Sequence, residues 1–228
     1  MEKKLTDRIA NTWVDRKLHR VYQALELGAM KFYNESRPLN LVKEIRREDG
    51  ELLLKPSEMV FVYSVACAQR KTRGDYAEVG VYKGATAKMI CEAKGDKHLY
   101  LFDTFEGIPD AGDIDKRFSK NQFPADIEQV KRRLRKYKNV HICKGMFPDT
   151  AKPMRNRRFA FVHLDVDVYK STKDCLAFFY KRMEKNGIII SHDYSSSAGV
   201  KKAFDEFFEK RPEGIIQLPM SQCMIVKS

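Results

Sequence analysis

Four stretches of mostly apolar residues mark the chain, and each ends on or beside a carboxylate. They cover residues 75–80, 99–103, 159–165 and 187–193, with the acids Glu78, Asp103, Asp165 and Asp193. Near-continuous apolar runs are typical of parallel strands, because such strands are buried on both faces. In an open α/β sheet, ligands bind beyond the carboxyl ends of the strands. We therefore expect these acids to line a pocket that prefers a cation, a ribose or a metal.

The pattern between these runs predicts alternating helices and further strands. Helices are expected over 84–93 and 124–136, a strand over 139–144, and a C-terminal hairpin from 214–218 and 223–226. Ser171 is expected to cap the helix that follows the strand ending at Asp165. Five parallel strands followed by an antiparallel pair resemble the class I methyltransferase architecture. The predicted fold is therefore α/β and Rossmann-like, with a seven-stranded, mostly parallel sheet, a C-terminal antiparallel hairpin and additional N-terminal helices.

The first part of the chain predicts helices of another kind. Residues 6–35 have the period of one or two amphipathic helices. Their apolar stripe consists of Leu5, Ile9, Trp13, Leu18, Val21, Leu25 and Leu27. A further helix is expected over 56–69, with Ser57 as its N-cap. We therefore predict a helical extension over residues 1–56 and a ligand-binding domain over residues 57–228.

The segment from Asp103 to Phe123 has no clear period. It contains Gly107, Pro109 and Gly112 together with the acids Glu106, Asp110, Asp113 and Asp115. A loop of this length inside a compact domain is usually functional. We therefore expect a lid or a binding loop here.

Composition narrows the class of protein. With 228 residues and 43% hydrophobic content, the chain can fill a sizeable core. Its five cysteines are far apart, odd in number and without a Cys-x-x-Cys pair, which indicates reduced thiols in a cytoplasmic protein. Neither a signal peptide nor an apolar run of membrane-spanning length is evident, so no membrane partner is expected.

The net charge of +12 raises the question of nucleic acid. The densest basic cluster covers residues 131–138, at the end of a predicted helix, where cations also complement the helix dipole. No known RNA- or DNA-binding motif accompanies it. We therefore favour a solvated helix face, and nucleic acid is not the expected partner.

The turn after the first strand is a candidate cofactor site. Gly80 and Gly84 flank Val81 and Tyr82, and missing side chains let a ligand approach the backbone closely. The spacing differs from the Gly-x-Gly-x-x-Gly of dinucleotide sites, which present a helix N-terminus to a pyrophosphate. S-adenosylmethionine has no phosphate and carries cationic groups that would suit Glu78, while Asp103 could accept bonds from ribose hydroxyls. The alternative is that the glycines serve helix packing and the aspartate is a cap.

The last two strand ends suggest a divalent metal. Asp165 and Asp167 are two residues apart, and His192 and Asp193 end the next strand. Oxygen-rich ligation suits Mg²⁺ or Mn²⁺, which can lower the pKa of a bound hydroxyl. The alternative is that Asp167 caps the following helix and that His192 hydrogen-bonds to backbone.

Four segments carry a specific resemblance. EVGVYKGATAK, LFDTFEGIP, HLDVDVYKSTKDCL and GIIISHDY occur in this order. They resemble the macrocin O-methyltransferase (TylF/MycF-like) family, which methylates sugar hydroxyls with S-adenosylmethionine and Mg²⁺, over roughly residues 57–210. The resemblance implies that Glu78, Gly80 and Asp103 hold the cofactor, with Val81, Tyr82, Gly84, Thr104 and Phe105 beside them. It also implies that Asp165 is a metal ligand and general base.

One departure from the family affects the metal. The family's Asp-Asp-Tyr supplies two further ligands, and here it reads His192-Asp193-Tyr194. Because imidazole is a softer ligand, Mg²⁺ should bind less tightly and Mn²⁺ becomes the better candidate. Without a metal, His192 could itself accept the hydroxyl proton. The predicted catalytic residues are thus Asp165 and His192, and the predicted metal ligands are Asp165, His192 and Asp193.

These observations predict an S-adenosylmethionine-dependent O-methyltransferase. Its acceptor is expected to be a small-molecule hydroxyl on a sugar or a glycosylated metabolite. Two alternatives are a basic methyltransferase that modifies RNA and a non-catalytic S-adenosylmethionine-binding module. In such enzymes the N-terminal region often helps to build the acceptor pocket or an oligomer contact, so a homo-oligomer is a further expectation.

Overall fold

The protein is described here by a computed structural model, which covers residues 13–50, 52–109 and 111–228. The chain forms two compact units, residues 1–61 and 62–228, and the division falls inside helix α4, Pro56–Ala68. Each unit is described by itself. Within the described residues, no helix combines the length and the apolar character that crossing a membrane requires.

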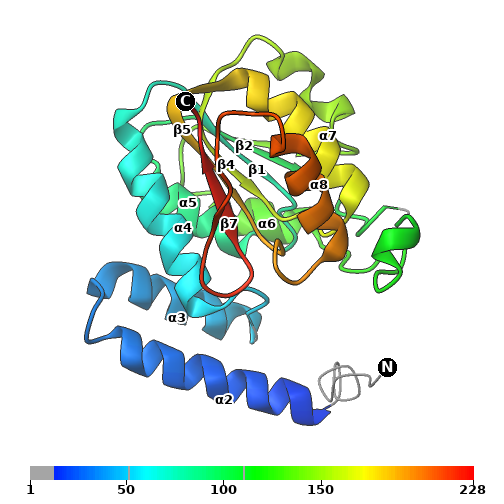
Figure 1. Ribbon diagram of the computed structural model, residues 1–228. Coiled ribbons are helices and arrows are strands. Elements are labelled where there is room, and N and C mark those ends of the chain that lie inside the picture. The colour runs from blue at the N-terminus through cyan, green and yellow to red at the C-terminus, as the bar shows by residue number, and fades with distance from the viewer. Residues whose placement is uncertain (1–12, 51, 110) are drawn as a thin grey trace. The chain divides into compact units, whose positions relative to one another are not determined.

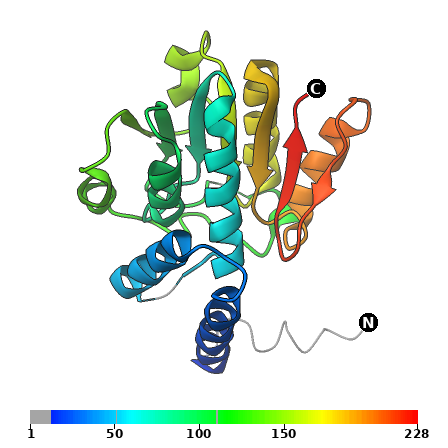
Figure 2. The same ribbon diagram turned by 90° about the vertical axis from the view of Figure 1, so that its left-hand side faces the viewer.

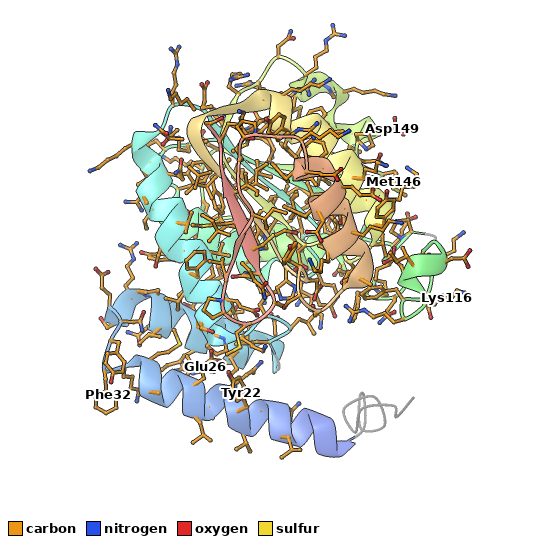
Figure 3. The ribbon with its side chains drawn as sticks, viewed as in Figure 1. Tyr22, Glu26, Phe32, Lys116, Met146 and Asp149 are labelled. Carbon is orange, nitrogen blue, oxygen red and sulfur yellow. The ribbon has the colours of Figure 1, made fainter. Side chains whose placement is uncertain are left out.

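The first unit contains helices α2 (Trp13–Met30) and α3 (Ser36–Asp49) and the start of α4. Leu27, Val42 and Ile45 are buried, and Gln23 Nε2 donates a hydrogen bond to the Leu52 carbonyl at 2.9 Å. The labelled side chains of Tyr22 and Glu26 both come from α2 (Figure 3). The buried side of this helix is therefore marked by Gln23 and Leu27, one turn apart.

Part of the predicted apolar stripe of α2 is exposed in this chain. Leu18, Val21 and Leu25 are 59%, 51% and 70% exposed. Gln23, which the predicted stripe does not include, is buried, and the hydrogen bond from its amide to the Leu52 carbonyl offsets the cost of burying a polar group. Leu5, Ile9 and the side chain of Trp13 lie outside the described residues.

Helix α4 begins as predicted at Pro56, but Ser57 does not cap it. Glu58 instead accepts a hydrogen bond from the backbone N–H of Lys55 at 2.9 Å, which is one half of a capping box. Ser57 lies within the first turn, and its hydroxyl donates to Glu26 of α2. The serine therefore connects two helices of the first unit.

The second unit is built on a seven-stranded sheet. Its strands are β1 Asp75–Val79, β2 Leu99–Asp103, β3 Val140–Lys144, β4 Phe159–Leu164, β5 Met183–Ser191, β6 Ile216–Gln217 and β7 Cys223–Val226. Their order is β3-β2-β1-β4-β5-β7-β6, and β1 to β5 are parallel while β7 runs antiparallel to β5 and to β6. This confirms the predicted fold.

Helices cover both faces of the sheet (Figures 1 and 2). Helix α5 (Ala85–Ala93) and the second-unit part of α4 lie on one face, with α6 (Ile127–Leu134) in contact with α5. Helices α7 (Tyr169–Phe179) and α8 (Ala198–Phe208) cover the other. Between that pair and the sheet, Phe159 and Phe179 meet edge to face with ring centres 5.1 Å apart, and both are fully buried.

The strand order reverses between β1 and β4, which is where an open α/β sheet binds its ligands. Gly80 follows β1 and Asp165 follows β4 at this point. A Cβ atom on Gly80 would overlap the carbonyl oxygen of Asp165. The close approach of these two turns therefore requires glycine.

Candidate active site

Four residues just beyond the ends of neighbouring strands have left-handed backbone. Tyr82 follows β1, Phe105 follows β2, Asp167 follows β4 and Asp193 follows β5, with φ of 50°, 58°, 63° and 63°. Such a conformation costs a non-glycine residue about 1 kcal/mol or more and is concentrated at functional sites. The carboxyl end of the sheet therefore stores strain on both sides of the point where the strand order reverses.

Asp103 fixes the turn after β1. Its Oδ2 accepts hydrogen bonds from the backbone N–H groups of Val81 at 2.7 Å and Tyr82 at 2.8 Å. Its Oδ1 accepts from the N–H of Phe105 at 2.6 Å. The carboxylate thus holds two turns together at the edge where a cofactor was predicted. It remains partly exposed, so a ligand can also reach it.

The Glu78 side chain lies inside the sheet and not on the surface of the predicted cofactor site. Its side chain is fully buried, and Oε1 lies 3.0 Å from Nδ1 of His163, its register partner on β4. Burial, partly offset by the hydrogen bond from His163, raises the pKa of Glu78 to about 6. In this conformation the Glu78 carboxylate is buried beneath the turn after β1, and its role toward a cofactor stays a prediction. His163 is likewise fully buried, among the apolar residues of β4.

The other predicted cofactor residues divide by exposure. Val81, Gly84 and Phe105 are buried, whereas Gly80, Tyr82 and Thr104 are partly exposed. Gly84, at φ 77°, is the N-cap of α5. The Thr104 hydroxyl donates to the Gly107 carbonyl at 3.0 Å and so closes a local turn. The surface that this edge offers a ligand therefore comes from Gly80, Tyr82, Asp103 and Thr104.

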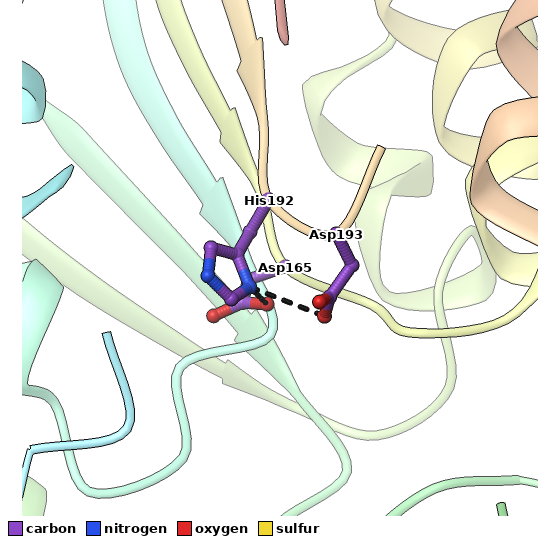
Figure 4. A group of neighbouring side chains, drawn as sticks. All are labelled: Asp165, His192 and Asp193. Carbon is purple, nitrogen blue, oxygen red and sulfur yellow. Dashed lines mark ion pairs between the residues drawn. The ribbon is translucent and has the colours of Figure 1, made fainter. Parts of the chain in front are cut away.

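The structure brings Asp165, His192 and Asp193 together (Figure 4). One potential ligand atom from each lies within 4.8 Å of the others. Nδ1 of His192 is 3.2 Å from Oδ1 of Asp165 and 3.1 Å from Oδ2 of Asp193. All three side chains are partly buried at the ends of β4 and β5. The imidazole therefore points into the space between the carboxylates.

The charges in this cluster are strongly coupled. Burial raises the pKa of Asp193, but hydrogen bonds from His192 and Ser196 and the positive charge of Arg117 hold it well below its usual range. Burial, followed by the charges of Asp165 and Asp193, raises the pKa of Asp167 well above its usual range. The site therefore concentrates more negative charge than its own positive groups offset.

A divalent cation fits this donor set. Two carboxylate oxygens and an imidazole nitrogen suit Mn²⁺ and related ions, and oxygen ligands alone suit Mg²⁺. Donor atoms about 3 Å apart have the spacing of neighbouring ligands on an octahedral ion with ligand distances of about 2.1 Å. Without an ion, a proton on Nδ1 of His192 would point at either carboxylate, which leaves Nε2 as a proton acceptor.

Two residues beside the cluster were missed by the sequence analysis. Arg117 Nη1 donates to the Ser196 carbonyl at 2.7 Å, and Nη2 lies 3.9 Å from Oδ1 of Asp193. Arg117 comes from the segment expected to be a lid or binding loop. No local motif marks the contact between Arg117 and Ser196, because the two residues are 79 positions apart in the chain.

The basic cluster of α6 is largely ion-paired. Lys131 lies 2.7 Å from Glu128, and Arg132 lies 3.4 Å from Asp126. Beyond the helix, Lys136 lies 3.3 Å from Glu92. These contacts favour the solvated helix face over a nucleic-acid interface.

Comparisons with known proteins show a family match, related sequences and a shared fold. Residues 62–223 match the family model described as Macrocin-O-methyltransferase (TylF). The 8-demethyl-8-(2,3-dimethoxy-alpha-L-rhamnosyl)-tetracenomycin-C 4'-O-methyltransferase of Streptomyces olivaceus is 30% identical over 142 residues, which are 55% of this chain and 54% of that protein. The demethyldecarbamoylnovobiocin O-methyltransferase of Streptomyces niveus is 28% identical over 154 residues, 60% of this chain and 59% of that protein. The chain thus spans little more than half the length of these relatives.

A solved structure shares the fold. The O-methyltransferase NovP superimposes with a TM-score of 0.68 at 23% identity, over 78% of this chain and 82% of that one. At this level of identity the likeness bears on architecture alone.

Proposed function

Because this chain belongs to the macrocin O-methyltransferase family, we propose that it transfers a methyl group from S-adenosylmethionine to a hydroxyl of a sugar or a glycosylated small molecule. The observation that carries the proposal is the family match over residues 62–223, which contains every candidate residue at the strand ends. One relative is by name a 4'-O-methyltransferase of a rhamnosyl tetracenomycin, which supports a sugar hydroxyl as the acceptor.

The proposed reaction is a single displacement. The acceptor oxygen forms a bond to the methyl carbon while the carbon–sulfur bond breaks, which leaves S-adenosylhomocysteine. The hydroxyl proton passes to a base, for which Asp165 is our first candidate and Nε2 of His192 our second. The exposed part of the turn at Gly80 and Tyr82 would hold the methyl donor, and Asp103 would accept bonds from its ribose.

We also propose that Asp165, His192 and Asp193 bind a divalent cation, Mn²⁺ or Mg²⁺. Such an ion supplies orientation of the acceptor hydroxyl and a lower pKa for it. The convergence of one potential ligand atom from each of the three side chains within 4.8 Å supports this role. Residues 1–56 are proposed to contribute to the acceptor pocket or to a contact between copies of the chain, in a cytoplasmic enzyme.

Calorimetry with S-adenosylmethionine and S-adenosylhomocysteine tests the cofactor first. Purified protein is then incubated with the methyl donor, Mn²⁺ and a panel of deoxysugar glycosides with free hydroxyls, and products are read as the mass increase of one methyl group. Asp165→Ala is the negative control. Absence of cofactor binding would remove the proposal, and binding without turnover on any acceptor would favour a non-catalytic module.

A further inference from the structure

The buried carboxylate of Asp115 attaches the segment between β2 and α6 to helices α7 and α8. The short helix Asp113–Asp115 lies in this segment. Asp115 is 2% exposed, whereas the Asp113 side chain is 99% exposed and pairs only at its surface with Lys116. The labelled side chain of Lys116 extends outward from the same short segment (Figure 3). Burial of one of two neighbouring acids indicates a specific role for Asp115.

Asp115 contacts the starts of two helices. Its Oδ2 accepts a hydrogen bond at 2.8 Å from the backbone N–H of Tyr169, the first residue of α7. Its Oδ1 lies against Gly199 in the first turn of α8, where a Cβ atom would collide with the carboxylate. Helix N-termini carry positive potential, so a carboxylate between two of them is stabilised.

Further contacts connect this segment to the residues that are proposed to bind the metal. Two positions after Asp115, Arg117 donates to the Ser196 carbonyl and lies beside Asp193. Ser197 in turn donates its hydroxyl to the Asp167 carbonyl at 2.9 Å. The segment, both helix starts and the strand ends therefore form one connected set of contacts.

We propose that Asp115 is a positioning residue, which holds this segment against α7 and α8 so that Arg117 stays beside Asp193 and the segment forms a wall of the acceptor site. The proposal rests on the proposed function for its kinetic part. Arg117 is half exposed and reaches Asp193 only at 3.9 Å, so it is a weak attachment by itself. Asp115 is the buried, charged attachment that keeps the arginine in place.

Two variants approach this contact from opposite sides. Asp115→Asn keeps the shape and removes the charge, and Gly199→Ala places a methyl group where the carboxylate lies. Asp113→Asn is the matched control, because it removes the exposed acid of the same short helix. We expect both test variants to increase amide hydrogen exchange in residues 111–123 and to raise KM for the acceptor about tenfold, the effect of weakening the charge-assisted hydrogen bond from the Tyr169 N–H. The dissociation constant of S-adenosylhomocysteine should change less than about twofold, because Asp103 and the turn after β1 are untouched.

The outcomes separate this proposal from the function itself. Unchanged exchange in Asp115→Asn, or an equal effect of Asp113→Asn, would overturn it. A lower kcat with unchanged KM and unchanged exchange would also overturn it, because that result would mean that Asp115 acts on the chemical step and does not hold the segment. If Asp115→Asn fails to fold, the exchange and KM measurements on Gly199→Ala test the proposal instead. If the wild-type protein methylates no acceptor, the proposed function fails, but the exchange measurements still show whether Asp115 fastens the segment.

Discussion

Nδ1 of His163 lies 3.0 Å from Oε1 of Glu78 across the β1–β4 pair, and both side chains are withdrawn from solvent. An ionisable pair in the middle of a parallel sheet costs desolvation energy, which is why burial is the largest influence on the Glu78 pKa. The pair lies two residues before Gly80 on one strand and two before Asp165 on the other. It therefore forms the floor under the point where the strand order reverses.

Glu78→Gln should change how stability depends on pH. The folded state raises the Glu78 pKa from 4.5 to about 6 and so binds its proton more tightly than the unfolded state does. This contribution to stability is fully present below pH 4.5 and is lost as the pH rises through about 6. As the pH rises through this range, the free energy of unfolding of the wild type should fall by about 2 kcal/mol relative to that of the variant.

Urea unfolding at several pH values measures this difference. Glu128→Gln, an exposed glutamate of α6, serves as the control and should show no such trend. A constant difference between wild type and Glu78→Gln would contradict the prediction.

Gly80→Ala should be severely destabilising. The added methyl group would overlap the Asp165 carbonyl, and φ is +85° at this position. We expect a loss of about 3 kcal/mol or more in the free energy of unfolding. Gly112→Ala is the control, since nothing lies within 4 Å of its Cβ position, and it should stay within about 0.5 kcal/mol of wild type. Equal melting temperatures for the two variants would show that the two turns can separate at little cost.

Asp103→Asn should weaken both the fold and the cofactor site. An amide cannot accept from Val81, Tyr82 and Phe105 at once, so we expect a loss of about 3 kcal/mol in stability and weaker binding of S-adenosylhomocysteine. Asp126→Asn is a suitable control, because Asp126 also accepts from backbone as the N-cap of α6. It should change stability by less than about 0.5 kcal/mol, because asparagine caps a helix about as well as aspartate, and it should leave cofactor affinity unchanged. Calorimetry on both variants makes the comparison, and normal cofactor binding in Asp103→Asn would argue against a ligand at this edge.

His192→Asp should change metal preference. Imidazole favours transition metals, and a third carboxylate favours Mg²⁺. We expect the wild type to bind Mn²⁺ at least about tenfold more tightly than Mg²⁺, and the variant to narrow that ratio. Titration calorimetry with each ion measures this ratio of affinities. The Asp165→Asn variant should lose binding of both ions. A wild-type preference for Mg²⁺ would mean that the imidazole is not a ligand.

The sheet could be predicted because its signal is local. Each parallel strand is buried on both faces, so the apolar run 99–103 coincides with β2, and the acids at the strand ends are visible in the sequence. Convergence of the acids and the histidine at the last two strand ends was expected from the residues, and the family resemblance narrowed the predicted metal ligands to Asp165, His192 and Asp193. These features depend on neighbours in the chain and on one rule of sheet topology.

Contacts between distant segments could not be predicted. Ser171 was expected to cap α7, but the helix starts earlier, at Tyr169, and its first N–H is bound by Asp115, 54 positions away. The pairing of Glu78 with His163 depends on the register of β1 with β4, which no short motif encodes. Both cases concern polar groups whose partners are chosen by tertiary structure.

The left-handed residues at the strand ends also affect how this protein would respond to selection for heat tolerance. Exchanging Tyr82 or Phe105 for glycine would relax the main chain locally, yet it would delete a partly exposed ring beside the proposed cofactor site in the first case and a buried ring in the second. Directed evolution that selects only for thermal stability would favour substitutions at these positions and would lower activity. Stabilising libraries are better aimed at the opposite end of the sheet, where the chain is free of this conflict.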